Sequence, residues 1–130
     1  MLNHSTFNIP QQQWDAAKAE ALAVLLAQAQ AKVKRPISYS ELVSKITRLD
    51  LEPHSQQLAH MLGEISEETY KSTGVLLTAL VVHKEDNLPG NGFFELAKRL
   101  GERFGADQLA KLTYWTCQFE KAIETYGKKT

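Results

Sequence analysis

The stretch "LLTALVVHKEDNLPGNGFFELAKRLG" (residues 76–101) decides the fold, because its character changes twice. Together with Val75 it opens as "VLLTALVV", whose β-branched and leucine residues predict a buried strand over residues 75–82. A "PGNG" loop follows at residues 89–92. "FFELAKRLG" then predicts an amphipathic helix over residues 93–101, closed by Gly101. A strand, a Gly-rich loop and a helix therefore succeed one another directly.

Two predicted helices precede this stretch. "SYSELVSKITRLD" (residues 38–50) favours a helix capped by Ser38 or Ser40, with Glu41 in the first turn, where the helix dipole favours a negative charge. "SQQLAHMLGEISEETYK" (residues 55–71) predicts the next helix, which starts near His54 or Ser55 and ends at Gly74. A pair of helices followed by a strand and a Gly-rich loop is typical of a winged helix, whose second helix enters the major groove of DNA.

A long helix is predicted on each side of this core. The first covers residues 10–34 and is stopped by Pro36; the last covers residues 107–127 and is capped by Asp107. The last helix carries an apolar seam at steps of three and four, which the first helix or a second copy of the chain must cover. The seam consists of Leu109, Leu112, Thr116, Phe119, Ile123 and Tyr126. We therefore expect one domain over residues 1–130: a mainly α, winged helix-turn-helix-like domain with a small β element, a core at 35–92 and long N- and C-terminal helices.

Composition limits the partners of this domain. The 130 residues include 15 Lys and Arg against 15 Asp and Glu, so binding to nucleic acid needs a local basic patch. The longest uncharged helical run, "ALAVLLAQAQA", is too short to span a bilayer, so no membrane partner is expected. The N-terminus shows no secretory signal, and Cys117 has no partner for an internal disulfide. These features predict a cytoplasmic protein.

The helix that starts near His54 carries the candidate nucleic-acid contacts. Its first turns are rich in neutral polar side chains that could read base edges, namely His54, Ser55, Gln56, Gln57 and His60. Phosphate contacts would come from basic residues on neighbouring elements, namely Lys34, Arg35, Lys45, Arg48 and Lys84. Against this interpretation, Glu64, Glu67 and Glu68 on the same helix would repel phosphates. A solvated polar face is the alternative.

Other kinds of site find weaker support. The "PGNG" loop lacks the Gly-Lys-Ser/Thr of a Walker loop and the third glycine of a dinucleotide loop, so a structural turn is the preferred interpretation. Arg48 and His54 have the spacing of one class of helical ribonucleases, but Pro53 separates them. His54 and His60 do not have a metal-binding helical interval, and Cys117 between Trp115 and Phe119 suggests a buried thiol. The sequence therefore predicts no catalytic residue, no cofactor and no metal.

Three segments, "RPISYSELVSKI", "HMLGEI" and "LLTALVVHKEDNLPG", resemble the winged-helix domain of alkylguanine-DNA alkyltransferases and alkyltransferase-like proteins. The resemblance covers roughly residues 35 to 92 and implies a DNA-binding fold. The alkyltransferases carry a Pro-Cys-His-Arg active site where their strand begins, whereas this chain has "LLTALVVH" there, with neither cysteine nor arginine. Alkyl transfer is therefore not predicted, and no catalytic residue is carried over.

These observations predict a non-enzymatic winged-helix module that binds DNA through the helix from His54 and the loop after His83, and a regulatory role is the one such a module would be expected to have. The alternative is a protein–protein interaction subunit that uses the same fold and docks a partner, or a second copy of itself, through the C-terminal helix. Zero net charge favours this alternative. A small nuclease or a nucleotide-binding protein ranks below both.

Overall fold

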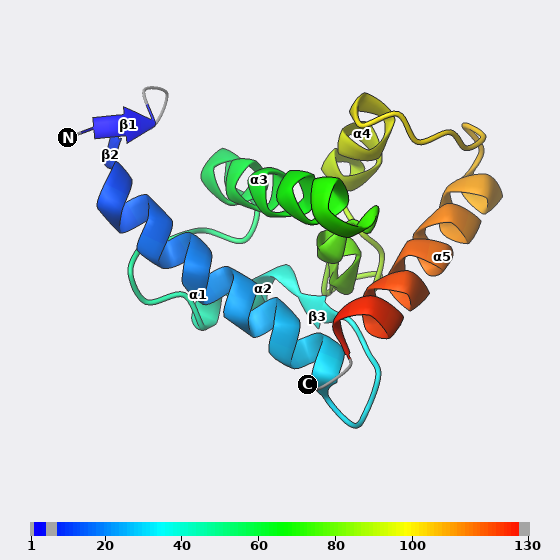
Figure 1. The fold of residues 1–130 in the computed structure, drawn as a ribbon, viewed down its shortest axis with the longest axis horizontal. Helices are drawn as coiled ribbons and strands as arrows, with labels where there is room; N and C mark the ends of the chain where they lie inside the picture. The colour runs from blue at the N-terminus through cyan, green and yellow to red at the C-terminus, as the bar shows by residue number, and fades with distance from the viewer. Residues whose placement is uncertain (1, 5–7, 128–130) are drawn as a thin grey trace.

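The computed structural model describes residues 2–4 and 8–127, and in this part the chain is a mainly helical domain with a small β element (Figure 1). Five α-helices lie in the described part: α1 (Gln11–Gln30), α2 (Tyr39–Ser44), α3 (Gln56–Thr73), α4 (Asn91–Arg99) and α5 (Gln108–Tyr126). Strand β1 (Leu2–His4) pairs antiparallel with β2 (Ile9–Pro10), and β3 (Ile37–Ser38) pairs parallel with β4 (Val81–Val82). No helix among the described residues has both the length and the apolar character needed to cross a bilayer.

The predicted N-caps and glycine stops of the helices are confirmed. The side-chain oxygens of Ser38, Ser55 and Asp107 each accept a hydrogen bond from the backbone N–H three residues on, at 3.0 to 3.1 Å. These are helix N-caps. Gly74 and Gly101 follow α3 and α4 with φ of 77° and 103°, a conformation that glycine adopts without steric cost.

Two predicted helices end early. The helix expected over residues 10–34 ends at Gln30, because the chain becomes extended at Ala31 and the Lys34 Nζ donates to the Ala29 carbonyl oxygen at 2.9 Å. The helix expected over residues 38–50 ends at Ser44. Helix propensity continues beyond both ends, but the chain has to turn so that β3 reaches β4 and α3 reaches the core.

The segment from Val75 to Val82 is the centre of the molecule and is entirely buried. The prediction of a strand over its whole length is wrong for Leu77–Leu80, which form a 3-10 helix, η1. Strand geometry remains at Val81–Val82, where β3 lies alongside. The rest of the segment lies among α1, α3 and α5, which offer side chains instead of a neighbouring strand (Figure 1).

Polar side chains of α3 supply some of the hydrogen bonds that a sheet would have provided. The Ser66 Oγ accepts from the Thr78 N–H at 3.1 Å and also bonds the Thr78 hydroxyl. The Thr69 Oγ1 donates to the Val75 carbonyl oxygen at 2.8 Å. Both side chains are buried and lie on the face of α3 that meets the central segment.

Helix α5 supplies the partners on the other side of this segment. The Gln118 Oε1 accepts from the Leu76 N–H at 3.0 Å, and the Trp115 Nε1 donates to the Ala79 carbonyl oxygen at 2.8 Å. The Gln118 Nε2 donates to Glu102 at 3.2 Å, so the amide is bonded at both ends although the residue is 1% exposed. Leaving a buried backbone N–H without a partner costs about 1–3 kcal/mol, which explains a glutamine in this core.

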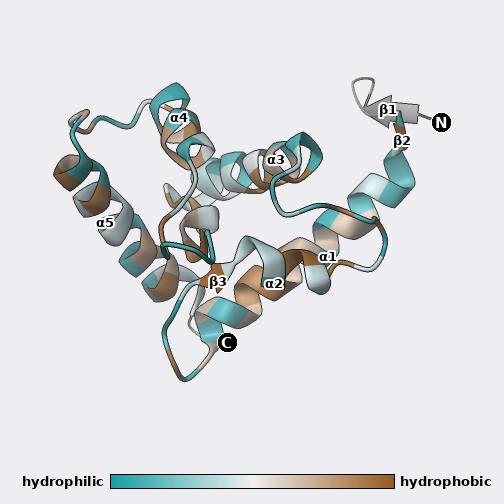
Figure 2. Ribbon diagram, turned by 180° about the vertical axis from the view of Figure 1, so that it is seen from behind, coloured by the Kyte–Doolittle hydropathy of each residue, from teal (hydrophilic) through white to brown (hydrophobic). Residues whose placement is uncertain are grey.

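The central segment separates two apolar clusters. The larger cluster joins the inner face of α1 to residues of α2 and α3, and Figure 2 shows apolar residues gathered where α1, α2 and β3 meet. The inner face of α1 consists of Trp14, Ala17, Ala21, Leu25 and Ala29. The smaller cluster lies between the central segment, α4 and α5, and α4 contributes Phe93, Phe94, Leu96 and Ala97. Helix α3 runs unbroken through Gly63 and buries Leu58, Met61, Leu62 and Ile65.

The apolar seam predicted on α5 is covered in part. Phe119, Ile123 and Tyr126 pack against the core, where α5 meets α1. The N-terminal part is open, because Leu109 is 72% exposed. Cys117 is exposed, so the prediction of a buried thiol is wrong. The helix turns Gln118 and Ala122 toward the core instead, and this rotation leaves Cys117 outside.

Replacing Gln118 by Leu should lower the free energy of unfolding by about 1–3 kcal/mol, because the Leu76 N–H loses its acceptor inside the core. Urea unfolding followed by circular dichroism measures the change. Gln108→Leu at the exposed start of α5 is the matched control and should stay within about 0.5 kcal/mol. Equal effects of the two substitutions would mean that the Gln118–Leu76 hydrogen bond contributes little.

Candidate functional site

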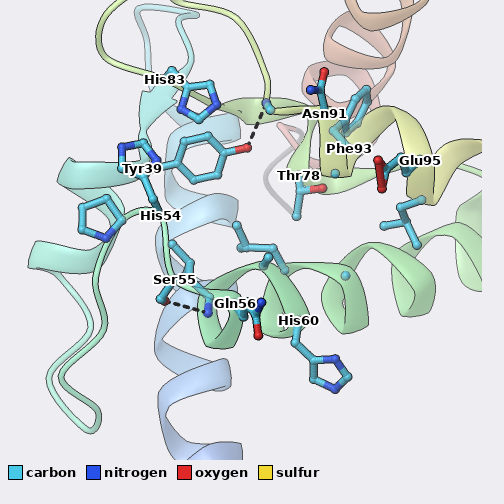
Figure 3. Close-up of a pocket in the computed structure, with 18 of the residues that line it drawn as sticks. Tyr39, His54, Ser55, Gln56, His60, Thr78, His83, Asn91, Phe93 and Glu95 are labelled. Atoms are coloured by element: carbon cyan, nitrogen blue, oxygen red, sulfur yellow. Dashed lines mark hydrogen bonds between the residues drawn. The ribbon is translucent and has the colours of Figure 1, made fainter. Parts of the chain in front are cut away.

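An open cleft of about 680 Å³ lies between the first turns of α3 and the first turns of α4 (Figure 3). Its polar lining comes from Gln56 and His60 on α3 and from Asn91, Glu95 and Arg99 on α4. Its buried lining is mostly apolar, with Leu58, Leu62, Phe93 and Leu96 beside the buried hydroxyl residue Thr78. An apolar interior with a polar rim is the usual character of a ligand-binding site.

The small parallel sheet builds one end of the cleft. Ile37 lies opposite Val81, and Ser38 lies opposite Val82. Tyr39 directly follows β3 and His83 directly follows β4, and the centroids of their rings lie 4.8 Å apart. The His54 ring, from the turn before α3, lies 5.3 Å from that of His83. The structure therefore gathers three planar side chains from three separate segments (Figure 3).

Tyr39 also ties this cluster to the Gly-rich loop. Its hydroxyl oxygen accepts a hydrogen bond from the Gly90 N–H at 3.2 Å. Burial raises the pKa of Tyr39 above its ordinary value, with the Gly90 hydrogen bond acting in the opposite direction, so the phenol is neutral at pH 7. A Cβ on Gly90 would lie 3.1 Å from the His83 Nε2 and 3.3 Å from the Tyr39 hydroxyl oxygen. A side chain at this position would therefore be tight against both neighbours, which would have to move by a few tenths of an ångström to admit it.

The loop after β4 closes on itself and holds His83 in place. The His83 N–H donates to the Leu88 carbonyl oxygen, and the Asn87 N–H donates to the His83 carbonyl oxygen, both at 2.8 Å. Asn87 has φ of 58°, in the left-handed region that asparagine tolerates better than most residues. The Asp86 Oδ1 accepts from the Leu88 N–H at 3.0 Å. The loop after His83, where the wing of a winged helix is expected, is thus a short turn that is closed by hydrogen bonds between its own residues.

The residues predicted to face bases divide into two groups. His54, Ser55, Gln56 and His60 line the cleft, whereas Gln57 is half-buried outside its lining. The Ser55 hydroxyl already caps α3, but Gln56 and His60 are exposed on the cleft wall. The first turns of α3 therefore present Gln56 and His60 on an accessible surface.

A carboxylate accompanies this polar face. The His60 Nε2 lies 3.2 Å from the Glu64 Oε2. Glu64 also accepts from the Trp14 Nε1 at 2.8 Å and lies 3.4 Å from the Lys18 Nζ. Lys18 in turn pairs with Glu68, and these contacts raise its pKa against the opposing effect of burial. Lys18 of α1 therefore partly neutralises Glu64 and Glu68, whereas Glu67 pairs with Lys71 on α3 itself.

The structure describes all five residues predicted to contact phosphates, and none of them lines the cleft. Lys34 closes the end of α1, while Arg35 and Lys45 lie on either side of Glu41 at 4.0 and 3.8 Å. Arg48 and Lys84 are exposed on separate loops.

Sequence reasoning missed Arg99, Glu95, Tyr39 and His83. Asn91, Glu95 and Arg99 recur at steps of four, which puts them on one face of a helix, so the α4 wall could have been found from the sequence. Tyr39 and His83 are brought together by strand pairing between segments far apart in the chain. A single sequence gives no local signal for that pairing.

No protein-family model, no curated protein and no solved structure matches this chain. The order of α2, α3, β4 and a Gly-rich loop agrees with the predicted outline. The assignment as a winged helix and the resemblance to the alkyltransferase domain stay predictions.

Replacing Gly90 by Ala should lower the free energy of unfolding by about 1 kcal/mol, because the His83 imidazole and the Tyr39 hydroxyl have to move by a few tenths of an ångström to admit the Cβ. Gly92→Ala is the matched control, since a Cβ there meets nothing within 4 Å and no stability should be lost. Urea unfolding gives both values. The proposed close packing at Gly90 would be contradicted by equal stability of the two variants.

Proposed function

We propose that this protein is a non-enzymatic DNA-binding module of the winged-helix type, which presents the first turns of α3 and the adjoining cleft to DNA. The observation that carries the proposal is the position of His54, Gln56 and His60 on an exposed cleft wall. Imidazole and amide groups are suited to hydrogen bonding with base edges, and glutamine pairs with adenine.

The shape of the cleft supports contact with bases as well as backbone. Of the planar rings that line it, Phe93 is buried and Tyr39 packs against His83. The exposed His54 and the half-buried His83 are therefore the rings that DNA could contact. Arg99 supplies a cation on the opposite wall, and Lys84 lies next to His83 in the chain. DNA that enters the cleft would meet rings, amides and a single arginine within the described lining.

Electrostatics predicts weak, moderately salt-sensitive binding. The chain has no net charge, and Glu95 balances Arg99 across one helix face. Each neutralised phosphate of duplex DNA contributes about −0.9 to the slope of log K against log salt concentration. If Arg99 and Lys84 each contact one phosphate, we expect a slope of about −2.

Substituting Arg99 with Glu should bring the slope from about −2 to about −1 and weaken binding at low salt. Fluorescence anisotropy with a labelled random duplex at several salt concentrations measures both quantities. Lys71→Glu, near the far end of α3 and 73% exposed in its side chain, is the matched charge control. The proposed DNA surface fails if the wild type shows no salt-dependent binding, or if Lys71→Glu weakens binding as much as Arg99→Glu.

Filling the cleft should block DNA without any change of charge. Gly63 lines the cleft, and a Cβ there meets nothing within 4 Å, so Gly63→Leu places a larger side chain in open space. Binding should fall at least about tenfold while the helix gains stability, since glycine in a helix is about 0.5–1 kcal/mol less favourable than alanine. Ser72→Leu adds the same side chain to exposed α3 surface as the control. Unchanged affinity of Gly63→Leu would restrict DNA contact to surfaces outside the cleft.

A second candidate function, a protein-interaction subunit, is favoured by the uncovered start of α5. Leu109 is 72% exposed, and together with Leu112, Thr116 and Cys117 it lines a shallow hollow. Under this alternative the protein passes through a DNA column at low salt and self-associates or binds another protein through α5. Light scattering of the wild type and of Leu109→Asp separates self-association from a monomeric DNA binder.

A further inference from the structure

Two histidines and a glutamate meet at the mouth of the cleft. His54 belongs to the turn before α3, and His83 and Glu85 belong to the loop after β4. One ligand atom of each, a ring nitrogen or a carboxylate oxygen, lies within 4.8 Å of the others. The two imidazole rings lie 5.3 Å apart between centroids and are inclined by 31°. The three side chains therefore converge from two separate loops.

We infer that His54, His83 and Glu85 form a binding site for a divalent transition-metal ion of the zinc class. Neutral imidazole and carboxylate are common ligands of Zn²⁺, and imidazole also suits Ni²⁺ and Cu²⁺. Three protein ligands leave a fourth tetrahedral position for water or a bound ligand. His54 and His83 both line the cleft, so a bound ion would lie at its mouth.

The geometry requires a small inward movement of side chains. Zinc–ligand distances of about 2.0–2.2 Å put tetrahedral ligand atoms about 3.4 Å apart, closer than the 4.8 Å limit found here. His54 and Glu85 are exposed and can rotate to close this difference. His83 is the more restricted member, because the Tyr39 ring packs against it with 4.8 Å between centroids and Gly90 lies close to its Nε2.

The backbone around this site is already arranged. Hydrogen bonds from the His83 and Asn87 N–H groups close the loop that carries both His83 and Glu85. Asp86 is engaged with the Leu88 N–H, which leaves Glu85 as the carboxylate of this loop that faces the histidines. Because the loop keeps its shape, binding an ion needs the ordering of His54 and Glu85 alone.

A second histidine–carboxylate pair provides the internal control. His60 and Glu64 lie one turn apart on α3, with 3.2 Å between Nε2 and Oε2. Glu64 is shared with Trp14 and Lys18, so this pair is less available to an ion. Ion binding should depend on His54 and Glu85 and be independent of His60.

The test is a titration of the full chain, without an affinity tag, with Zn²⁺ in competition with a chromophoric chelator and with Co²⁺ followed by visible absorption. The wild type should bind one ion, and tetrahedral Co²⁺ should give intense visible bands. His54→Gln and Glu85→Gln, which change exposed side chains and leave the fold intact, should each weaken binding at least about tenfold. His60→Gln should bind as the wild type does.

Several results would overturn the site: no saturable binding below millimolar metal, unchanged affinity in both His54→Gln and Glu85→Gln, or a loss in His60→Gln of the same size. Circular dichroism of each variant separates a lost ligand from a lost fold. The titration contains no DNA, so its outcome is independent of the proposed DNA binding.

Discussion

The whole molecule depends on the complete burial of the backbone between Val75 and Val82. Buried N–H and C=O groups need hydrogen-bond partners, and for most of this segment no neighbouring strand offers them. Ser66 and Thr69 of α3 and Gln118 of α5 supply several of these partners. The positions of α3 and α5 are therefore tied to one apolar segment by polar bonds as well as by packing, and the two clusters lie on its two sides.

The same segment also builds the candidate site. It ends in β4, and the parallel register with β3 carries Tyr39 and His83 to adjacent places. The turn before α3 brings His54 beside them, and the Gly90 N–H is bound by Tyr39 as α4 begins. The pairing of two strands of two residues each is thus enough to bring the rings of Tyr39 and His83 together at the end of the cleft.

The proposed DNA and metal sites share this end of the cleft. The charged side chains of the opposite wall, Glu95 and Arg99, balance one another, and α3 carries Glu64 close to His60. A divalent ion held by His54, His83 and Glu85 would make the cleft mouth more positive, which favours phosphate. The two proposals are compatible, and neither requires the other.

The sequence by itself determined the local features, namely the capping serines and aspartate and the glycine stops, because these depend on residues within a few positions of one another. Tertiary structure alone decided that Leu77–Leu80 form a 3-10 helix, that α5 turns Gln118 inward and leaves Cys117 exposed, and that His83 meets His54. A run of apolar residues fits a buried strand or a buried helical turn equally well, and its surroundings select between them. The pairing of β3 with β4, which lie more than forty positions apart in the chain, is likewise fixed by the packed core, and no local sequence pattern predicts it.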